Sequence, residues 1–190
     1  MTLRRGRPAL CLAMLLLSAA PARTDPGPAA PAEEAVVKAE LVERFCRFID
    51  WPDGAFGPPE RPFVIGIFGT DPVASHLEEL ARLRLIQGRP VEVRRLATPA
   101  GAGDCHLVWV SASARDRLSA ILANTRGRAI LTIADSPGLA DAGVLINLVR
   151  LGGHLSFEIN LDEVRGSGLV FSSKLLRLGT IVVKAKESGR

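Results

Sequence analysis

Histidine, cysteine and paired acidic residues most often hold metals or carry out acid–base chemistry, and this sequence uses few of them. The three histidines, His76, His106 and His154, fall on a predicted helix, a predicted strand and a hairpin edge, with no pair at metal-ligand spacing. The sequence also lacks a G-x-S-x-G nucleophile elbow, a Walker loop and a C-x-x-C pair. We therefore expect no catalysis, no metal and no cofactor, and an enzyme of unrecognised type is the least favoured alternative.

Asn147 and Glu158 form the best polar pair in the sequence, because they are predicted to face each other across a hairpin. One carboxylate beside an amide is not an acid–base pair, so the favoured interpretation is a hydrogen bond that fixes the hairpin. Asp135 opens the loop 135–143 directly after a predicted buried strand, where open α/β sheets often bind ligands. The alternative is a ligand pocket formed by Asp135, Asn147 and Glu158, although the loop can equally be a simple turn.

The N-terminus has the three-part pattern of a secretory signal peptide. Arg4, Arg5 and Arg7 precede the apolar run 9–20, and Ala20-Pro21-Ala22 offers a cleavage site. An apolar run of this length is too short to cross a bilayer, which needs about 20 residues as a helix. We predict a signal peptide over 1–22, a Pro- and Ala-rich flexible leader over 23–32, and one domain over 33–186.

The predicted cleavage changes the charge of the chain from +4 to about +1, because 21 basic residues then face 20 acidic ones. The remaining arginines are dispersed and form no basic stripe, so a nucleic-acid partner is excluded. With 47% hydrophobic and 23% charged residues, the composition is that of an ordinary globular domain.

Two cysteines, Cys46 and Cys105, remain in an exported chain, whose compartment would be oxidising. They could form a disulfide, provided that the fold brings their Cα atoms within about 7 Å. The other interpretation is that both are small buried hydrophobic residues, because each lies within an apolar pattern. Cys11 lies at the start of the apolar run instead of ending it, which argues against a lipid anchor.

The stretch 144–178 predicts a compact C-terminal module. Gly152-Gly153 is a two-residue hairpin turn, which pairs Leu151 with His154 and Asn147 with Glu158. This register directs Ile146, Leu148, Leu155, Phe157 and Ile159 toward the core. Asn160 can then cap a short helix in a capping box with Glu163, and Ser172 or Ser173 can cap a final helix that starts at Lys174.

The rest of the domain alternates between helical and strand patterns. A helix over 33–49, with Val37, Leu41, Phe45 and Phe48 on its apolar stripe, ends before Pro52. Strands are predicted over 63–69, 90–96, 107–110 and 129–134. A helix after Asp71-Pro72 buries Val73, Leu77, Leu80 and Leu83, and a second begins in a capping box at Ser113 to Asp116. We predict a single α/β domain: a mixed sheet with helices on both faces and a C-terminal β-hairpin.

Four segments together resemble the YfiR family of periplasmic regulatory proteins. They are VKAELVERFCRFIDWP (37–52), FVIGIFGTDP (63–72), CHLVWVS (105–111) and INLVRLGGHLSFEINLDEVRGSGLVFSSKLLRL (146–178). The resemblance implies a periplasmic repressor that binds the periplasmic part of an inner-membrane diguanylate cyclase and links envelope cues to cyclic di-GMP. It also implies that a homodimer could form, and disulfides in relatives involve more cysteines than this chain has.

The leading hypothesis is therefore a periplasmic, non-enzymatic repressor of such a cyclase. Trp51-Pro52, at a rigid helix end, and Ser172-Ser173-Lys174, at a polar helix start, are the predicted contact sites. Trp51 has an alternative interpretation as a residue packed under the following loop. The alternative function is a periplasmic small-ligand-binding protein that serves a sensor kinase or an outer-membrane receptor system.

Overall fold

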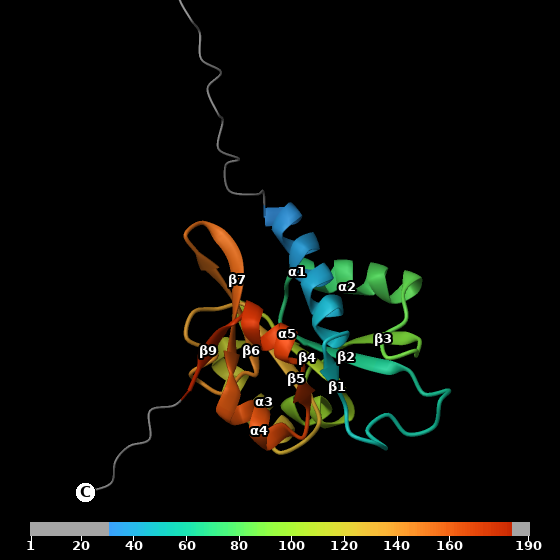
Figure 1. The fold of residues 1–190 in the computed structure, drawn as a ribbon. Coiled ribbons are helices and arrows are strands. Elements are labelled where there is room, and N and C mark those ends of the chain that lie inside the picture. The colour runs from blue at the N-terminus through green and yellow to red at the C-terminus, as the bar shows by residue number, and fades with distance from the viewer. Residues whose placement is uncertain (1–30, 184–190) are drawn as a thin grey trace, which may run out of the picture.

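The computed structural model describes residues 31–183 and shows a mixed seven-stranded sheet (Figure 1). The predicted signal peptide, almost all of the leader and residues 184–186 of the predicted domain lie outside the described residues. The strands are β1 (Ile49–Asp50), β2 (Phe63–Phe68), β3 (Val91–Arg95), β4 (Leu107–Val110), β5 (Leu131–Ala134), β6 (Ile146–Leu151), β7 (His154–Asn160), β8 (Val170–Phe171) and β9 (Thr180–Val182). The helices are α1 (Pro31–Cys46), α2 (Pro72–Leu83), α3 (Leu118–Thr125), α4 (Leu161–Ser167) and α5 (Ser173–Leu178), with 3₁₀ helices η1 (Pro99–Asp104) and η2 (Ala112–Arg117).

The sheet has the order β3-β2-β4-β5-β6-β7-β9. Strands β3, β2, β4, β5 and β6 are parallel, β7 runs antiparallel to β6, and β9 is parallel to β7. Strands β2, β4 and β5 are buried along their whole length, as expected for parallel strands that are covered on both faces.

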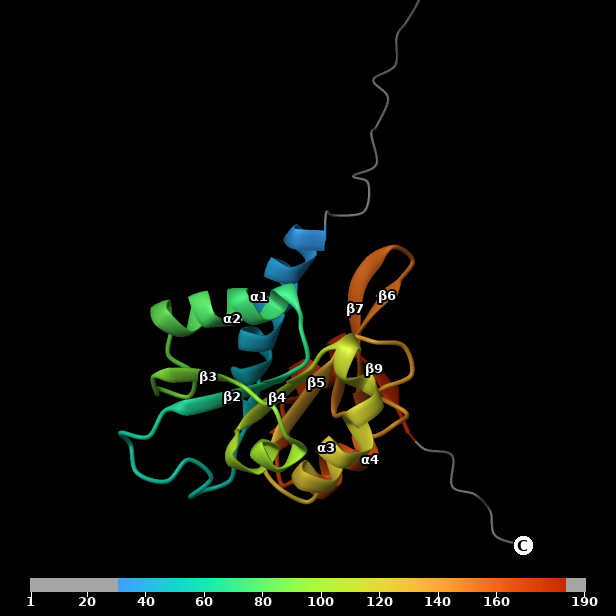
Figure 2. The same ribbon diagram turned by 180° about the vertical axis from the view of Figure 1, so that it is seen from behind.

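Two apolar clusters cover the two faces of the sheet. One contains residues of α1, α2, α4 and α5, and the other contains residues of α3, η1 and η2. In Figure 2, which views the molecule from behind, α3 lies in front of the sheet and α1 behind it. The prediction of a single α/β domain with helices on both faces and a C-terminal hairpin is confirmed.

The hairpin has the predicted register. Asn147 pairs with Glu158 and Leu151 with His154, and both turn glycines, Gly152 and Gly153, have positive φ angles. The Asn160 side chain caps α4 by accepting a hydrogen bond from the Glu163 amide at 3.0 Å. Local turn and cap chemistry therefore sets this part of the fold, as the sequence predicts.

Four local predictions are wrong. Helix α1 ends at Cys46 and not at Ile49, because Ile49–Asp50 form strand β1, which pairs with β8. Val37 is exposed, because the buried face of the helix runs through Ala35, Ala39 and Val42. Leu83 is exposed at the last position of α2. Ser113 lies in a 3₁₀ helix and caps nothing there, because its Oγ accepts a hydrogen bond from the Thr70 amide.

Candidate functional site

A cleft of about 430 Å³ lies between α1, the loop after β5 and the β6–β7 hairpin. Asp135 and Glu158, two of the three residues predicted to form a ligand pocket, line it. The third, Asn147, is fully buried beside the cleft and donates from Nδ2 to Glu158 Oε2 at 3.0 Å. The structure thus brings together the three predicted residues, and the hairpin hydrogen bond that the sequence favours is present.

The cleft contains charged residues that the sequence analysis missed. Lys38 Nζ lies 2.8 Å from Asp135 Oδ2 and 3.0 Å from Glu34 Oε1. Glu34 in turn pairs with Arg150 of the hairpin at 2.6 Å. The spacing of Glu34 and Lys38 at i,i+4 was a usable helix signal, but nothing local indicated that they meet residues 97 and 116 positions away.

This chain of ion pairs joins three elements: the hairpin, α1 and the end of β5. Burial raises the pKa of Asp135, and the hydrogen bond from Lys38 opposes that rise only in part. Burial would lower the pKa of Lys38, but its hydrogen bonds to Asp135 and Glu34 outweigh burial and raise it. The hydrogen bond from Arg150 is the largest cause that lowers the pKa of Glu34. The hydrogen bond between Lys38 and Asp135 therefore favours the charged form of each partner, against the burial that disfavours it.

The cleft also has unused hydrogen-bonding capacity. Asp135 Oδ1 and Asn147 Oδ1 are buried, and no donor among residues 31–183 reaches either atom. Buried acceptors of this kind are normally satisfied, so they suit a hydroxyl, amide or ammonium donor. Apolar side chains form the rest of the wall, namely Leu148, Leu151 and Leu155. The arrangement can bind a small polar molecule, and it offers no nucleophile.

The predicted contact residues fall in two different environments. Trp51 is only 9% exposed and packs against Phe56 and Phe63, with ring centroids 5.8 and 5.4 Å away, so it is a core residue and not a surface anchor. The following Pro52 is exposed. Ser172 caps α5 by accepting from the Leu175 amide, which fits the interpretation of this serine as a cap.

Lys174 and Ser173, in contrast, are exposed on α5. Lys174 Nζ lies 5.2 Å from the centre of the Phe48 ring. Val170, in the strand just before α5, and Leu178, at the end of α5, are 61% and 64% exposed. Positions 174, 177 and 178 share one side of a helix. We call this surface the α5 face, and it consists of Phe48, Val170, Lys174, Arg177 and Leu178.

Comparison with known proteins identifies the family. Residues 35–180 match the family described as YfiR/HmsC-like. This chain belongs to the YfiR/HmsC-like family. No curated protein matches the sequence.

Solved structures show the same kind of fold as this YfiR/HmsC-like chain at low sequence identity. One is an ABC domain in complex with L-Trp from Streptococcus pneumonia, with a TM-score of 0.50, 11% identity, and coverage of 80% of this chain and 60% of that chain. Another is a conserved domain protein from Vibrio cholerae O1 biovar El Tor, with a TM-score of 0.50, 11% identity, and coverage of 79% and 60%. This chain thus spans about 60% of the length of these structures, and the likeness shows the fold alone.

Cys46 and Cys105, the two cysteines within residues 31–183 of the YfiR/HmsC-like chain, are free and buried in different apolar clusters. Cys46 lies at the end of α1 and Cys105 precedes β4, and the sheet separates the two clusters. The suggested Cys46–Cys105 disulfide is therefore absent from this structure, and the interpretation of both as buried hydrophobic residues fits.

Both thiols should react slowly with a thiol reagent in the folded protein. Burial raises the pKa of Cys105 to about 11 and raises the pKa of Cys46 further, so the nucleophilic thiolate is scarce at neutral pH. Titration with Ellman's reagent at pH 8 should show little reaction of these two residues until guanidinium is added. Fast reaction before denaturation would contradict their burial.

Within residues 31–183, no three His, Cys, Asp or Glu side chains converge as a metal site would require. His106 instead accepts a hydrogen bond at Nδ1 from the Val64 amide at 2.8 Å. Over the same residues, every helix is too short or too polar to cross a bilayer.

Proposed function

We propose that this chain is a periplasmic, non-enzymatic regulator that binds the periplasmic part of an inner-membrane diguanylate cyclase and represses it. The observation that carries the proposal is membership of the YfiR/HmsC-like family over residues 35–180. The N-terminal order of arginines, apolar run and Ala-Pro-Ala supports export.

The α5 face is the surface that suits such a partner. Val170 and Leu178 expose apolar area, and Lys174 and Arg177 add positive charge beside it. Exposed apolar residues rimmed by polar ones are typical of protein interaction sites. The face is held firmly, because the Ser172 amide donates to the Phe48 carbonyl at 2.9 Å and β8 pairs with β1. A partner with an apolar surface next to acidic residues would match it.

Deletion of the gene should raise cellular cyclic di-GMP, and the wild-type gene should restore the low level. Val170→Asp and Lys174→Glu should fail to restore it. The first replaces an exposed apolar side chain of the α5 face by a negative charge, and the second reverses a positive charge there; neither removes a buried side chain. Matched controls are Leu83→Asp and Arg82→Glu, which change exposed residues of the same types on α2. The controls should repress fully.

The outcomes of this experiment test two claims separately: that the chain represses a cyclase, and that the α5 face is the contact surface. Equal abundance of each variant in the periplasmic fraction must be shown first. An unchanged cyclic di-GMP level on deletion, with the cyclase expressed, would contradict the repressor proposal. Full repression by both α5 variants would keep the repressor and discard the α5 face as the contact.

A second candidate function rests on the cleft. Asp135 and Glu158 line a cavity that has unsatisfied acceptors and an apolar wall, as a periplasmic small-ligand-binding protein would need. Such a protein would serve a sensor kinase or an outer-membrane receptor system. A gene for either of these beside this one, in place of a gene for a membrane protein with a GGDEF domain, would favour it.

A further inference from the structure

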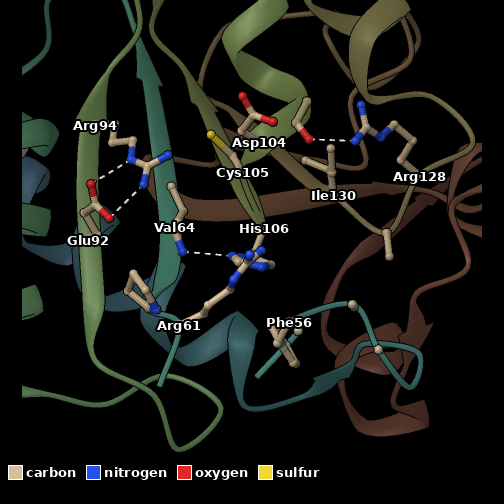
Figure 3. A pocket seen from close by; sticks show the side chains of 16 residues that line it. Phe56, Arg61, Val64, Glu92, Arg94, Asp104, Cys105, His106, Arg128 and Ile130 are labelled. Carbon is tan, nitrogen blue, oxygen red and sulfur yellow. Dashed lines mark hydrogen bonds and ion pairs between the residues drawn. The ribbon is translucent and has the colours of Figure 1, made fainter. Parts of the chain in front are cut away.

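A second, wider cavity of about 670 Å³ lies at the opposite end of the parallel strands from Asp135 (Figure 3). It is formed where β2, β4 and β5 begin, and the loop between β1 and β2 closes one side. Nothing in the sequence pointed to it, because its residues come from four separate segments. Six of these residues give the cavity its charge and its aromatic wall: Phe56, Arg61, Arg94, Gly103, His106 and Arg128.

Three arginines surround this cavity, and two of them have no acidic partner among the described residues. Arg94 is neutralised by Glu92, to which it donates two hydrogen bonds at 2.7 and 2.8 Å. Arg128 donates instead to backbone carbonyls, to Gly103 at 2.7 Å and to Asn124 at 3.5 Å. Across residues 31–183, no carboxylate lies within ion-pair distance of Arg61 or Arg128. Their guanidinium groups therefore retain the charge and donors that carboxylates and phosphates recognise.

An aromatic surface lies beside these cations. The rings of Phe56 and His106 are 5.1 Å apart, and Phe63 lies 5.2 Å from His106 on the inner side. Figure 3 shows Phe56 and His106 on the side of the cavity where Arg61 enters. Burial lowers the pKa of His106, and its Nδ1 is already occupied by the Val64 amide, so the ring is neutral at pH 7. The His106 ring therefore lines the cavity and is not expected to transfer protons.

The backbone at Gly103 leaves room for the side chain of Arg128, one of the two arginines without an acidic partner among the described residues. A Cβ atom built on Gly103 would lie 2.5 Å from Arg128 Nη1, so a side chain at position 103 would displace the Arg128 guanidinium group from where it lies. Glycine at this position thus allows the guanidinium group of Arg128 to lie across the loop and reach its carbonyl.

We propose that this cavity binds a small organic anion, whose carboxylate or phosphate is held by Arg61 and Arg128 and whose apolar part lies along the wall formed by Phe56 and His106. Two acidic side chains, Glu92 and Asp104, also line the cavity and lower the net positive charge there; Glu92 is paired with Arg94, and Asp104 lies beside the remaining cations. The proposal is independent of cyclase repression, since none of these residues belongs to the α5 face.

Isothermal titration calorimetry of the purified protein with benzoate, phenyl phosphate and benzyl alcohol tests the proposal. At least one of the two anions should bind saturably and at least tenfold more tightly than the neutral alcohol. Tighter binding of phenyl phosphate would assign a phosphate ligand, and tighter binding of benzoate a carboxylate ligand. Added salt should weaken binding, because the attraction is electrostatic and exposed to solvent.

Single variants locate the binding in the cavity. Arg61→Gln and Arg128→Gln should each weaken anion binding at least tenfold, whereas Asp104→Asn should strengthen it. Arg82→Gln is the matched control, because Arg82 is an exposed arginine on α2 away from the cavity. Arg61 is exposed, so its replacement reports on binding even if Arg128→Gln destabilises the fold. Absence of saturable binding, equal binding of benzyl alcohol, or an equal loss in Arg82→Gln would overturn the proposal.

Discussion

Replacement of Phe157 by alanine should lower the free energy of unfolding by about 3 to 5 kcal/mol, the range for removing a buried phenyl ring. Phe157 lies in the middle of β7, is nearly fully buried and packs edge-on against Phe45 of α1, with ring centroids 4.9 Å apart. The ring also fills the space above Gly179, where an added Cβ would lie 2.6 Å from Phe157 Cε2. Its removal would leave a cavity between the hairpin, α1 and the segment before β9.

Urea titration of the wild type and of Phe157→Ala at pH 7 measures this difference. His154→Ala is the control on the same strand, because His154 is exposed at the hairpin tip and its loss should cost less than about 0.5 kcal/mol. A loss below about 1 kcal/mol for Phe157→Ala would mean that the hairpin does not pack on α1 in the register described.

Replacement of Lys38 by methionine should cost about 3 kcal/mol at pH 7, because it leaves the buried carboxylate of Asp135 without its cation. Lys38 and Asp135 are largely buried, and their 2.8 Å contact joins α1 to the end of β5. Lys174→Met is the control, since Lys174 is an exposed lysine and its replacement should change stability by less than about 0.5 kcal/mol.

The loss of folding stability caused by Lys38→Met should become smaller as the pH falls. Burial raises the pKa of Asp135, so the folded state takes up a proton more readily than the unfolded state once Lys38 is gone. Protonation therefore favours the folded variant, and the difference from wild type should narrow as the pH falls through the raised pKa of Asp135. Asp135→Asn in the Lys38→Met background should recover much of the loss at pH 7. A cost independent of pH, with no recovery in the double variant, would show that packing and not charge holds this contact.

The sequence predicted best where short-range chemistry decides the structure. The Gly152-Gly153 turn fixes the hairpin register, and Asn160 fixes the start of α4, because each acts on neighbours in the chain. The face of α1 was predicted less well, since alanine is a weak apolar signal. Ala35 and Ala39 are buried only because the sheet approaches them closely, which periodicity cannot reveal.

The candidate site residues were likewise predicted where a rule of chain or sheet topology applies, and missed where only the tertiary fold brings them together. Asp135 was found from its place after a buried strand, a rule of sheet topology. Its partner Lys38 was missed because no local pattern relates the two residues. Arg61 and Arg128 were missed for the same reason, and Trp51 was offered as a surface anchor when tertiary packing buries it.

The pairing of β1 with β8 has a consequence for the order in which the chain folds. Ile49 pairs with Phe171, and the Phe48 carbonyl accepts from the Ser172 amide, so the end of α1 is completed by residues from the C-terminal module. Contacts between such distant segments form late, because a long loop must close first. As the chain emerges from synthesis, the residues that follow α1 therefore lack these backbone partners until residues near 170 are available.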